Sequence, residues 1–227
     1  MGVTLPLLVV LTMLLWVSFT KSVNAFWFND LWRYRQRVSI AAVTTQIENY
    51  QVQITGINTQ ALYNAGKIQA DCQDIRFTDI DGKLLEYWIE DDGTTCQNDA
   101  STDIWVKISR LVTGGPTTLY MYYGNPNAVP YQNGYRTFEF FDDFSGPSLD
   151  VSKWQVSGSP LINSGRLLLN NGQSIASYYQ ATVNSKIVFR GNQSVTSLDQ
   201  GIVGLSNSNL SSLFAADDSL AYNFDTT

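Results

Sequence analysis

The sequence predicts an all-β chain, in which a jelly-roll-like β-sandwich domain is followed by part of a second β-sandwich. Short runs of alternating apolar and polar residues recur along the chain and are broken by Gly, Asn and Asp. Beyond the N-terminal segment, no stretch shows the period of 3.6 residues that marks an amphipathic helix. Aromatic residues make up 13% of the chain and charged residues only 15%, so the chain can bury a core.

Residues 1–25 are predicted to be a signal peptide. An apolar run spans Leu5–Phe19, and Val23 and Ala25 precede a cleavage site before Phe26. The alternative is an uncleaved membrane anchor, because the apolar stretch reaches about 18 residues, the lower limit for a span. Under both alternatives the rest of the chain is extracellular or at the cell surface, and the anchor would be its only link to a membrane.

The first domain is expected over residues 26–136. Strands are predicted where apolar and polar residues alternate most clearly: 37–43, 49–55, 103–109 and 117–124. The segment 61–68 fits either a short strand or one helical turn. A connector rich in Pro, Asn and Gly, residues 126–137, leads out of this domain.

The second domain is expected over residues 137–227. Its apolar runs predict further short strands at 165–171, 185–191 and 201–206. A β-sandwich usually needs about a hundred residues or more, so we expect this domain to be truncated.

One acidic stretch, Asp71–Cys96, holds eight of the chain's twenty carboxylates. Its alternation predicts a hairpin whose three-residue loop, Ile80–Gly82, places Gly82 in the left-handed conformation. This loop predicts which residues lie opposite each other on the two strands: Phe77 and Leu85, Ile75 and Tyr87, and Asp79 and Lys83. We expect the last pair to form an ion pair that closes the turn.

Two cysteines flank the acidic stretch, Cys72 and Cys96. An exported chain passes through an oxidising compartment, which predicts a disulfide between them. Two free thiols are the alternative.

Several classes of site are excluded by composition. The chain has no histidine, which excludes His-based triads, HExxH zinc sites and imidazole general bases. The formal charge is −6 and the basic residues are scattered, so no nucleic-acid partner is expected. Catalysis would have to depend on carboxylates, Lys, Tyr or Ser, and no catalytic residue is assigned.

The acidic stretch does not form an EF-hand calcium loop. With Gly82 at the glycine position of that loop, the first ligand position is Phe77 and the last is Trp88, so two ligand oxygens are missing. A looser calcium site remains an alternative, and its candidate ligands are acidic residues of the two turns: Asp79, Asp81, Asp91 and Asp92.

The segment Glu86–Glu90, EYWIE, nearly matches the E-x-D-x-E motif of β-sandwich glucanases related to concanavalin A. In that motif the two glutamates act as nucleophile and acid/base, as retaining glycoside hydrolysis requires. Here Trp88 occupies the position of the aspartate. The alternative is a solvated strand face with a partly buried tryptophan. The ligand-binding candidates are the residues of this face and a neighbouring strand: Glu86, Trp88, Glu90 and Trp105.

Four segments of the first domain resemble the domain-of-unknown-function family 2341: Trp32–Ile40, Asp74–Glu90, Ile104–Leu111 and Leu119–Ala128. The cysteine pair is an addition to the family's usual pattern. The resemblance implies an exported or envelope protein of archaea or bacteria, in which this domain often stands beside sugar-binding-type sandwiches. It implies an architecture rather than an activity.

The segment Phe140–Trp154 resembles the start of a concanavalin A-like lectin/glucanase (laminin-G-like) domain. The resemblance implies that Asp142 and Asp143 are calcium ligands. The alternative is that these acids cap a turn while the neighbouring aromatic side chains pack in the core.

These observations favour a non-catalytic binding module whose partner is a glycan or a neighbouring surface protein. Four strand aromatics could form a sugar platform, and each has a core position as its alternative: Trp88, Trp105, Tyr120 and Tyr122. A glycoside hydrolase fragment is the second hypothesis, and its carboxylate pair would come from the second domain: Asp142, Asp143, Asp217 and Asp218. The third is a structural or sensing ectodomain of an envelope complex.

Overall fold

The computed structural model describes residues 27–90, 94–170, 172–180, 186–189, 201–205 and 220–224. The regular secondary structure of these residues is nearly all antiparallel strand, which confirms the predicted all-β class. The chain divides into two compact units between Thr137 and Phe138, each described separately below. Within the described ranges, no helix has the length and apolar character needed to cross a bilayer. The predicted signal peptide lies outside them.

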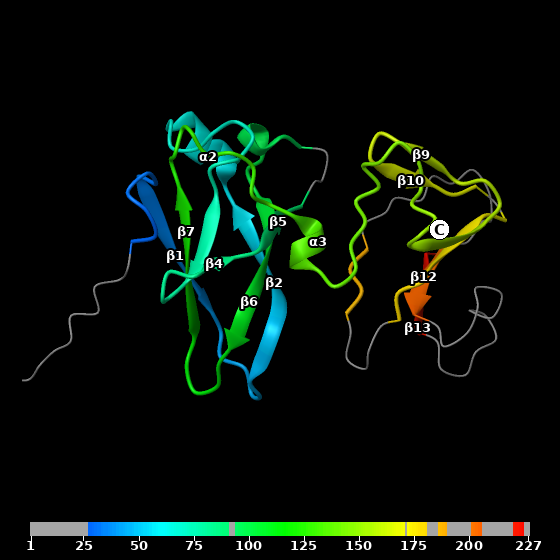
Figure 1. The fold of residues 1–227 in the computed structure, drawn as a ribbon, viewed down its shortest axis with the longest axis horizontal. Coiled ribbons are helices and arrows are strands. Elements are labelled where there is room, and N and C mark those ends of the chain that lie inside the picture. Colours follow the sequence, from blue (N-terminus) through cyan, green and yellow to red (C-terminus); the bar gives the residue numbers. More distant parts are fainter. Residues whose placement is uncertain are drawn as a thin grey trace, which may run out of the picture. The chain divides into compact units, whose positions relative to one another are not determined.

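The first unit is a β-sandwich of two sheets. A four-stranded sheet with the order β1-β7-β3-β4 packs against a three-stranded sheet with the order β2-β6-β5 (Figure 1). The strands are β1 (Tyr34–Ile40), β2 (Ile47–Ile57), β3 (Arg76–Asp79), β4 (Leu84–Leu85), β5 (Tyr87–Ile89), β6 (Thr102–Leu111) and β7 (Thr117–Tyr123). The helices are α2 (Thr59–Asn64), η1 (Cys96–Asn98) and α3 (Gly134–Thr137).

Helix α2 decides between the two alternatives for residues 61–68 in favour of a helical turn. The Asn58 side chain accepts a hydrogen bond from Ala61 N at 2.8 Å, so it caps the helix N-terminus.

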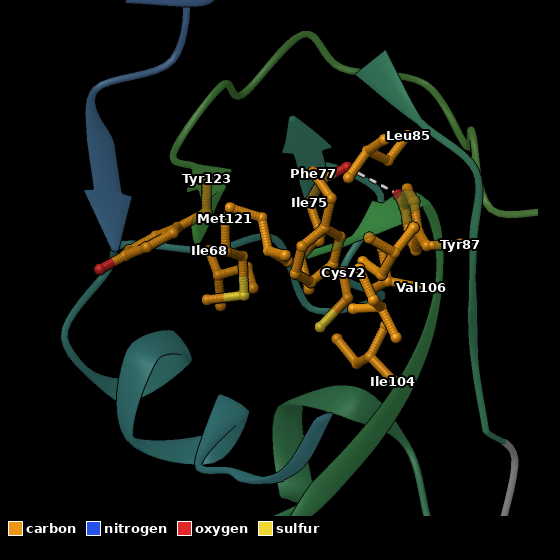
Figure 2. Close-up of a cluster of buried hydrophobic side chains, with 13 residues drawn as sticks. Ile68, Cys72, Ile75, Phe77, Leu85, Tyr87, Ile104, Val106, Met121 and Tyr123 are labelled. Carbon is orange, nitrogen blue, oxygen red and sulfur yellow. Dashed lines mark hydrogen bonds between the residues drawn. The ribbon is translucent and has the colours of Figure 1, made fainter. Parts of the chain in front are cut away.

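The core fills the space between the inner faces of the two sheets. Along β6 the alternation buries Ile104, Val106 and Ile108, as predicted. Phe77 and Met121 face them from the first sheet (Figure 2). The described core is continuous, because every strand of both sheets contributes side chains to one cluster.

The predicted hairpin loop and register are confirmed for β3 and β4. Phe77 pairs with Leu85 in an antiparallel ladder, and Gly82 has φ +83°. The predicted ion pair between Asp79 and Lys83 is wrong. Asp79 Oδ1 instead accepts hydrogen bonds from backbone N–H groups of the turn, including that of Lys83 at 2.8 Å, which caps the turn.

The predicted pairing of Ile75 with Tyr87 is also wrong. After β4 the chain passes to the second sheet at Glu86, so Tyr87 pairs with Val106. The Tyr87 hydroxyl reaches back across the core and donates to the Ile75 carbonyl at 2.6 Å (Figure 2). This crossing closes the sandwich on one side.

The opposite side of the sandwich ends in the edge strands β1 and β2. A groove of about 520 Å³ lies between them and has Met121 among its lining residues. Each of these strands pairs on one side only among the described strands. Arg35 and Arg37 on β1, and a bulge between Ile54 and Ile57 on β2, are features that protect edges against further pairing.

The predicted disulfide between Cys72 and Cys96 is confirmed, with Cα atoms 6.0 Å apart. It ties the loop before β3 to η1, and Cys72 is buried. A second contact joins the same two segments, because Gln97 N donates to the Ala70 carbonyl at 3.1 Å.

Asp74, only 1% exposed, holds the end of the sandwich together. Its carboxylate accepts from Gln69 N at 2.9 Å and Gly124 N at 2.8 Å, and its carbonyl accepts from Trp32 Nε1 at 3.0 Å. Burial raises the pKa of this carboxyl, and the N–H donors partly counteract that shift. Gly124 has φ +89°, and a Cβ there would lie 2.5 Å from the Tyr34 ring, so this position requires glycine.

The described residues of the second unit form three two-stranded antiparallel pairs: β8 (Trp154–Ser157) with β11 (Ser174–Ser177), β9 (Leu161–Asn163) with β10 (Arg166–Leu168), and β12 (Gly201–Leu205) with β13 (Leu220–Phe224). The strands predicted at 165–171 and 201–206 correspond to β10 and β12. Of the strand predicted at 185–191 the structure describes residues 186–189, and these are not in a strand.

Replacing Cys72 and Cys96 together by alanine should lower the free energy of unfolding by about 3 kcal/mol, because the disulfide restricts the unfolded chain. Urea unfolding of the oxidised chain and the double variant measures the difference. Reduction of the wild-type chain is the matched control and should lower its stability to a similar extent. Two alkylatable thiols in the unreduced wild-type protein would contradict the prediction.

Asp74→Ala should lower the free energy of unfolding by about 3 kcal/mol, because the N–H groups of Gln69 and Gly124 lose their acceptor. Asp81→Ala, at the exposed hairpin tip, is the matched control and should change stability by less than about 0.5 kcal/mol. Urea unfolding measures both variants, and equal effects would show that Asp74 has no special structural role.

Stability should fall between pH 10 and 12 as Tyr87 titrates. Burial raises the pKa of this hydroxyl to about 12. The unfolded chain therefore ionises first, and the stabilisation present below pH 10 is lost as pH rises, by about 2–3 kcal/mol. Tyr87→Phe should lower stability at neutral pH yet show a shallower alkaline decline in urea unfolding. Identical alkaline slopes would rule out Tyr87 as the cause.

Candidate functional site

The outer face of the second sheet brings aromatic and polar side chains together. Trp88 on β5 lies opposite Trp105 on β6, and Trp105 lies opposite Gln53 on β2. Their side chains point away from the core because their neighbours in sequence point into it. With two adjacent acids, these residues form the Trp face: Gln53, Trp88, Glu90, Asp103 and Trp105.

Hydrogen bonds fix the side chains of the Trp face. Glu90 Oε2 accepts from Trp105 Nε1 and from Gln53 Nε2, both at 3.1 Å. Gln53 Nε2 also donates to Asp103 Oδ2 at 3.1 Å, and the Gly56 N–H at the bulge donates to Asp103 Oδ1 at 3.3 Å. The two carboxylates are therefore bridged by one amide, which holds them in a defined geometry.

The two tryptophans differ in exposure. Trp105 is only 4% exposed, so it is a structural part of this face rather than an open platform. Trp88 is half-buried. Helix α3 packs beside β5 and β6, and Gln51 Nε2 donates to the Thr137 carbonyl at 2.9 Å, which attaches the end of α3 to the same sheet.

Glu86 lies where the chain passes between the sheets, and its partners differ from those of Glu90. It forms an ion pair with Arg136 at 3.0 Å and accepts from the Tyr131 hydroxyl at 3.1 Å. Burial raises the pKa of the Tyr131 hydroxyl, and the adjacent Glu86 carboxylate raises it further. Two guanidinium groups lie over the Tyr131 ring, with the Cζ atom of Arg76 5.1 Å and that of Arg136 4.8 Å from the ring centroid. Glu86 thus anchors the connector, whereas Glu90 belongs to the Trp face.

The other two aromatics considered for a platform lie on the outer face of the first sheet. Tyr122 is fully buried beneath Trp27 and Phe28, and the Trp27 ring packs against it at a right angle. Tyr120 lies under Arg35, whose guanidinium carbon is 4.3 Å from the ring centroid. The four aromatics therefore belong to two separate faces of the sandwich.

Sequence reasoning did not select Gln53 or Asp103 as site residues. Both occupy polar positions of strands with a predicted alternation, and this alternation indicates that their side chains point away from the core. Their proximity to Glu90 depends on the pairing of β2 and β5 with β6, which a single strand pattern does not reveal.

In the second unit, Asp142 and Asp143 organise the turn that leads to β8. Asp142 accepts from Phe144 N at 2.9 Å and from Trp154 Nε1 at 2.7 Å, and Asp143 accepts from the N–H of Ser145 at 3.1 Å. Phe140 contacts the Trp154 ring edge-on, with centroids 5.1 Å apart. This arrangement matches a capped turn over aromatic packing.

Their predicted role as calcium ligands stays a prediction. In the part of the chain that the structure describes, no three acidic or cysteine side chains come together as a cation site. Four of the candidate acids lie outside the described residues: Asp91, Asp92, Asp217 and Asp218.

One protein family matches part of the chain. No curated protein and no solved structure is significantly similar to the chain. Residues 71–157 match the family described as domain of unknown function, DUF2341. The match begins in the loop before β3, includes the Trp face strands β5 and β6, and ends with β8 in the second unit. From Asp71 onward, the first unit is therefore similar to DUF2341.

Proposed function

We propose that this chain is an exported, non-catalytic binding module at the cell surface and that the Trp face binds a glycan. The observation that carries the proposal is the position of Trp88 beside the hydrogen-bonded group of Gln53, Glu90 and Asp103. Sugars have apolar ring faces and a rim of hydroxyls, so they suit an aromatic side chain next to fixed polar groups.

The preformed geometry of the Trp face favours binding. Glu90 is held by Trp105 and Gln53, and Asp103 by Gln53 and the Gly56 N–H, so these carboxylates need little ordering when a ligand arrives. Ordering costs are a large part of the free energy lost on association, and a preformed site reduces them.

The second unit is part of the same proposal, as the start of a concanavalin A-like sandwich. Support comes from the segment Phe140–Trp154, in which a capped turn lies over packed aromatics, and from the antiparallel strand pairs that follow. Export is supported by the predicted signal peptide and by the Cys72–Cys96 disulfide, a bond that persists in oxidising compartments.

Glycan-array screening of the full chain, with and without calcium, should identify a binding glycan. Trp88→Ala should then weaken binding to it at least tenfold, about 1.4 kcal/mol, in calorimetric titration. Gln53→Ala should also weaken binding, because it removes the bridge between Glu90 and Asp103.

Tyr63→Ala is the matched control, since Tyr63 is an exposed aromatic of the same unit on α2. It should leave affinity unchanged, and circular dichroism checks that all variants fold. If no glycan binds under either calcium condition, or if Trp88→Ala binds as tightly as the wild-type chain, the proposal is wrong.

A further inference from the structure

The segment just before β1 is fixed on the outer face of the first sheet. The Trp27 ring packs edge-on against Tyr122 with centroids 5.5 Å apart, and Phe28 N donates to the Tyr122 hydroxyl at 3.3 Å. At the other end of the segment, Trp32 is buried and bonded to the Asp74 carbonyl. The fold therefore holds this segment in place from Trp27 onward.

Two apolar side chains of this fixed segment remain at the surface. Trp27 is 39% exposed and Leu31 is 60% exposed. Three arginines follow: Arg33, which is exposed and directly precedes the edge strand β1, and then Arg35 and Arg37, which alternation along β1 directs to the outer face of the first sheet. We call these five residues the N-terminal patch.

The N-terminal patch is basic in an acidic protein. The chain has a formal charge of −6, yet residues 27–40 contain three arginines and one acid, Asp30. The Arg35 guanidinium carbon lies 4.9 Å from the Trp27 ring centroid, so a cation and an exposed indole are held together. Arg33 and Arg37 are exposed. This combination of indole, leucine and arginine is the chemistry enriched where proteins meet the bilayer–water interface.

The sequence places this patch close to a strongly apolar run. Seven residues, 20–26, separate the end of the apolar run Leu5–Phe19 from Trp27. Even a fully extended linker of that length reaches only about 25 Å. A bilayer that receives the apolar run, for translocation or as an anchor, therefore lies within reach of the patch.

We propose that the N-terminal patch binds the surface of a bilayer containing anionic phospholipids and holds the β1 edge of the first unit against it. The arginines complement the headgroup charge, while Trp27 and Leu31 enter the interface. This contact is separate from glycan binding. Arg35 and Arg37, with Trp27 packed beside them, lie on the outer face of the first sheet and the Trp face on that of the second, so the two groups point to opposite sides of the sandwich.

The test uses the full chain produced from its complete gene, with its N-terminus determined by mass spectrometry. A processed chain is mixed with vesicles, and a chain that keeps the apolar run is reconstituted into them. Vesicles of phosphatidylcholine alone are compared with vesicles that also contain phosphatidylglycerol, both with brominated acyl chains that quench nearby tryptophans. Subtracting the quenching seen in Trp27→Phe isolates the signal of Trp27 in either form of the chain.

Trp27 should be quenched at least fivefold more strongly in the anionic vesicles than in the neutral ones, and high salt should reduce the difference. Arg33→Gln with Arg37→Gln should abolish that preference. The matched control, Lys83→Gln with Arg110→Gln, removes the same charge elsewhere and should retain it. Circular dichroism checks folding. The proposal is overturned if Trp27 is not quenched or if its quenching is the same in anionic and neutral vesicles. It is also overturned if the two double variants show the same preference for anionic vesicles.

Discussion

The sandwich of the first unit depends on one buried carboxylate. Asp74 accepts hydrogen bonds from Gln69 in the loop before β3 and from Gly124 after β7, while its carbonyl binds Trp32 before β1. These segments are far apart in sequence, and each presents an N–H that would otherwise be buried without an acceptor. A short acidic side chain meets this need because its two oxygens face different donors. The close approach of Gly124 to the Tyr34 ring completes the same junction.

The connection at Glu86 links this core to the candidate site. Because the chain changes sheets there, Tyr87 turns inward to bond the Ile75 carbonyl, and Trp88 turns outward beside Trp105. Glu86 itself is held by Arg136 and Tyr131 from the connector after β7. The crossing is thus fixed from both sides, and the position of the Trp face follows from the same crossing that closes the sandwich.

Local patterns predicted what depends on neighbours in sequence. The alternation and the glycine at position 82 were enough to give the register of Phe77 with Leu85, because a tight turn fixes its own strands. The change of sheet at Glu86 was not predictable in this way, since it follows from which strand accepts Tyr87. For the same reason the sequence grouped Tyr122 with Trp88, although long-range pairing places them on opposite sheets. Helix α2 was ambiguous because its apolar pattern is too short to distinguish a strand from a helical turn.

The outer faces of the two sheets of the first unit hold their aromatic side chains by different contacts. On the first sheet, Arg35 lies over the rings of Trp27 and Tyr120, so the cation stacks on the ring faces. On the second sheet, Glu90 accepts from the indole N–H of Trp105, so the carboxylate holds the ring by its edge. The stacked guanidinium of Arg35 keeps a positive charge on the outer face of the first sheet. On the Trp face, the carboxylate fixes the buried Trp105 ring in its plane, and the half-buried Trp88 lies opposite Trp105, next to the carboxylates of Glu90 and Asp103.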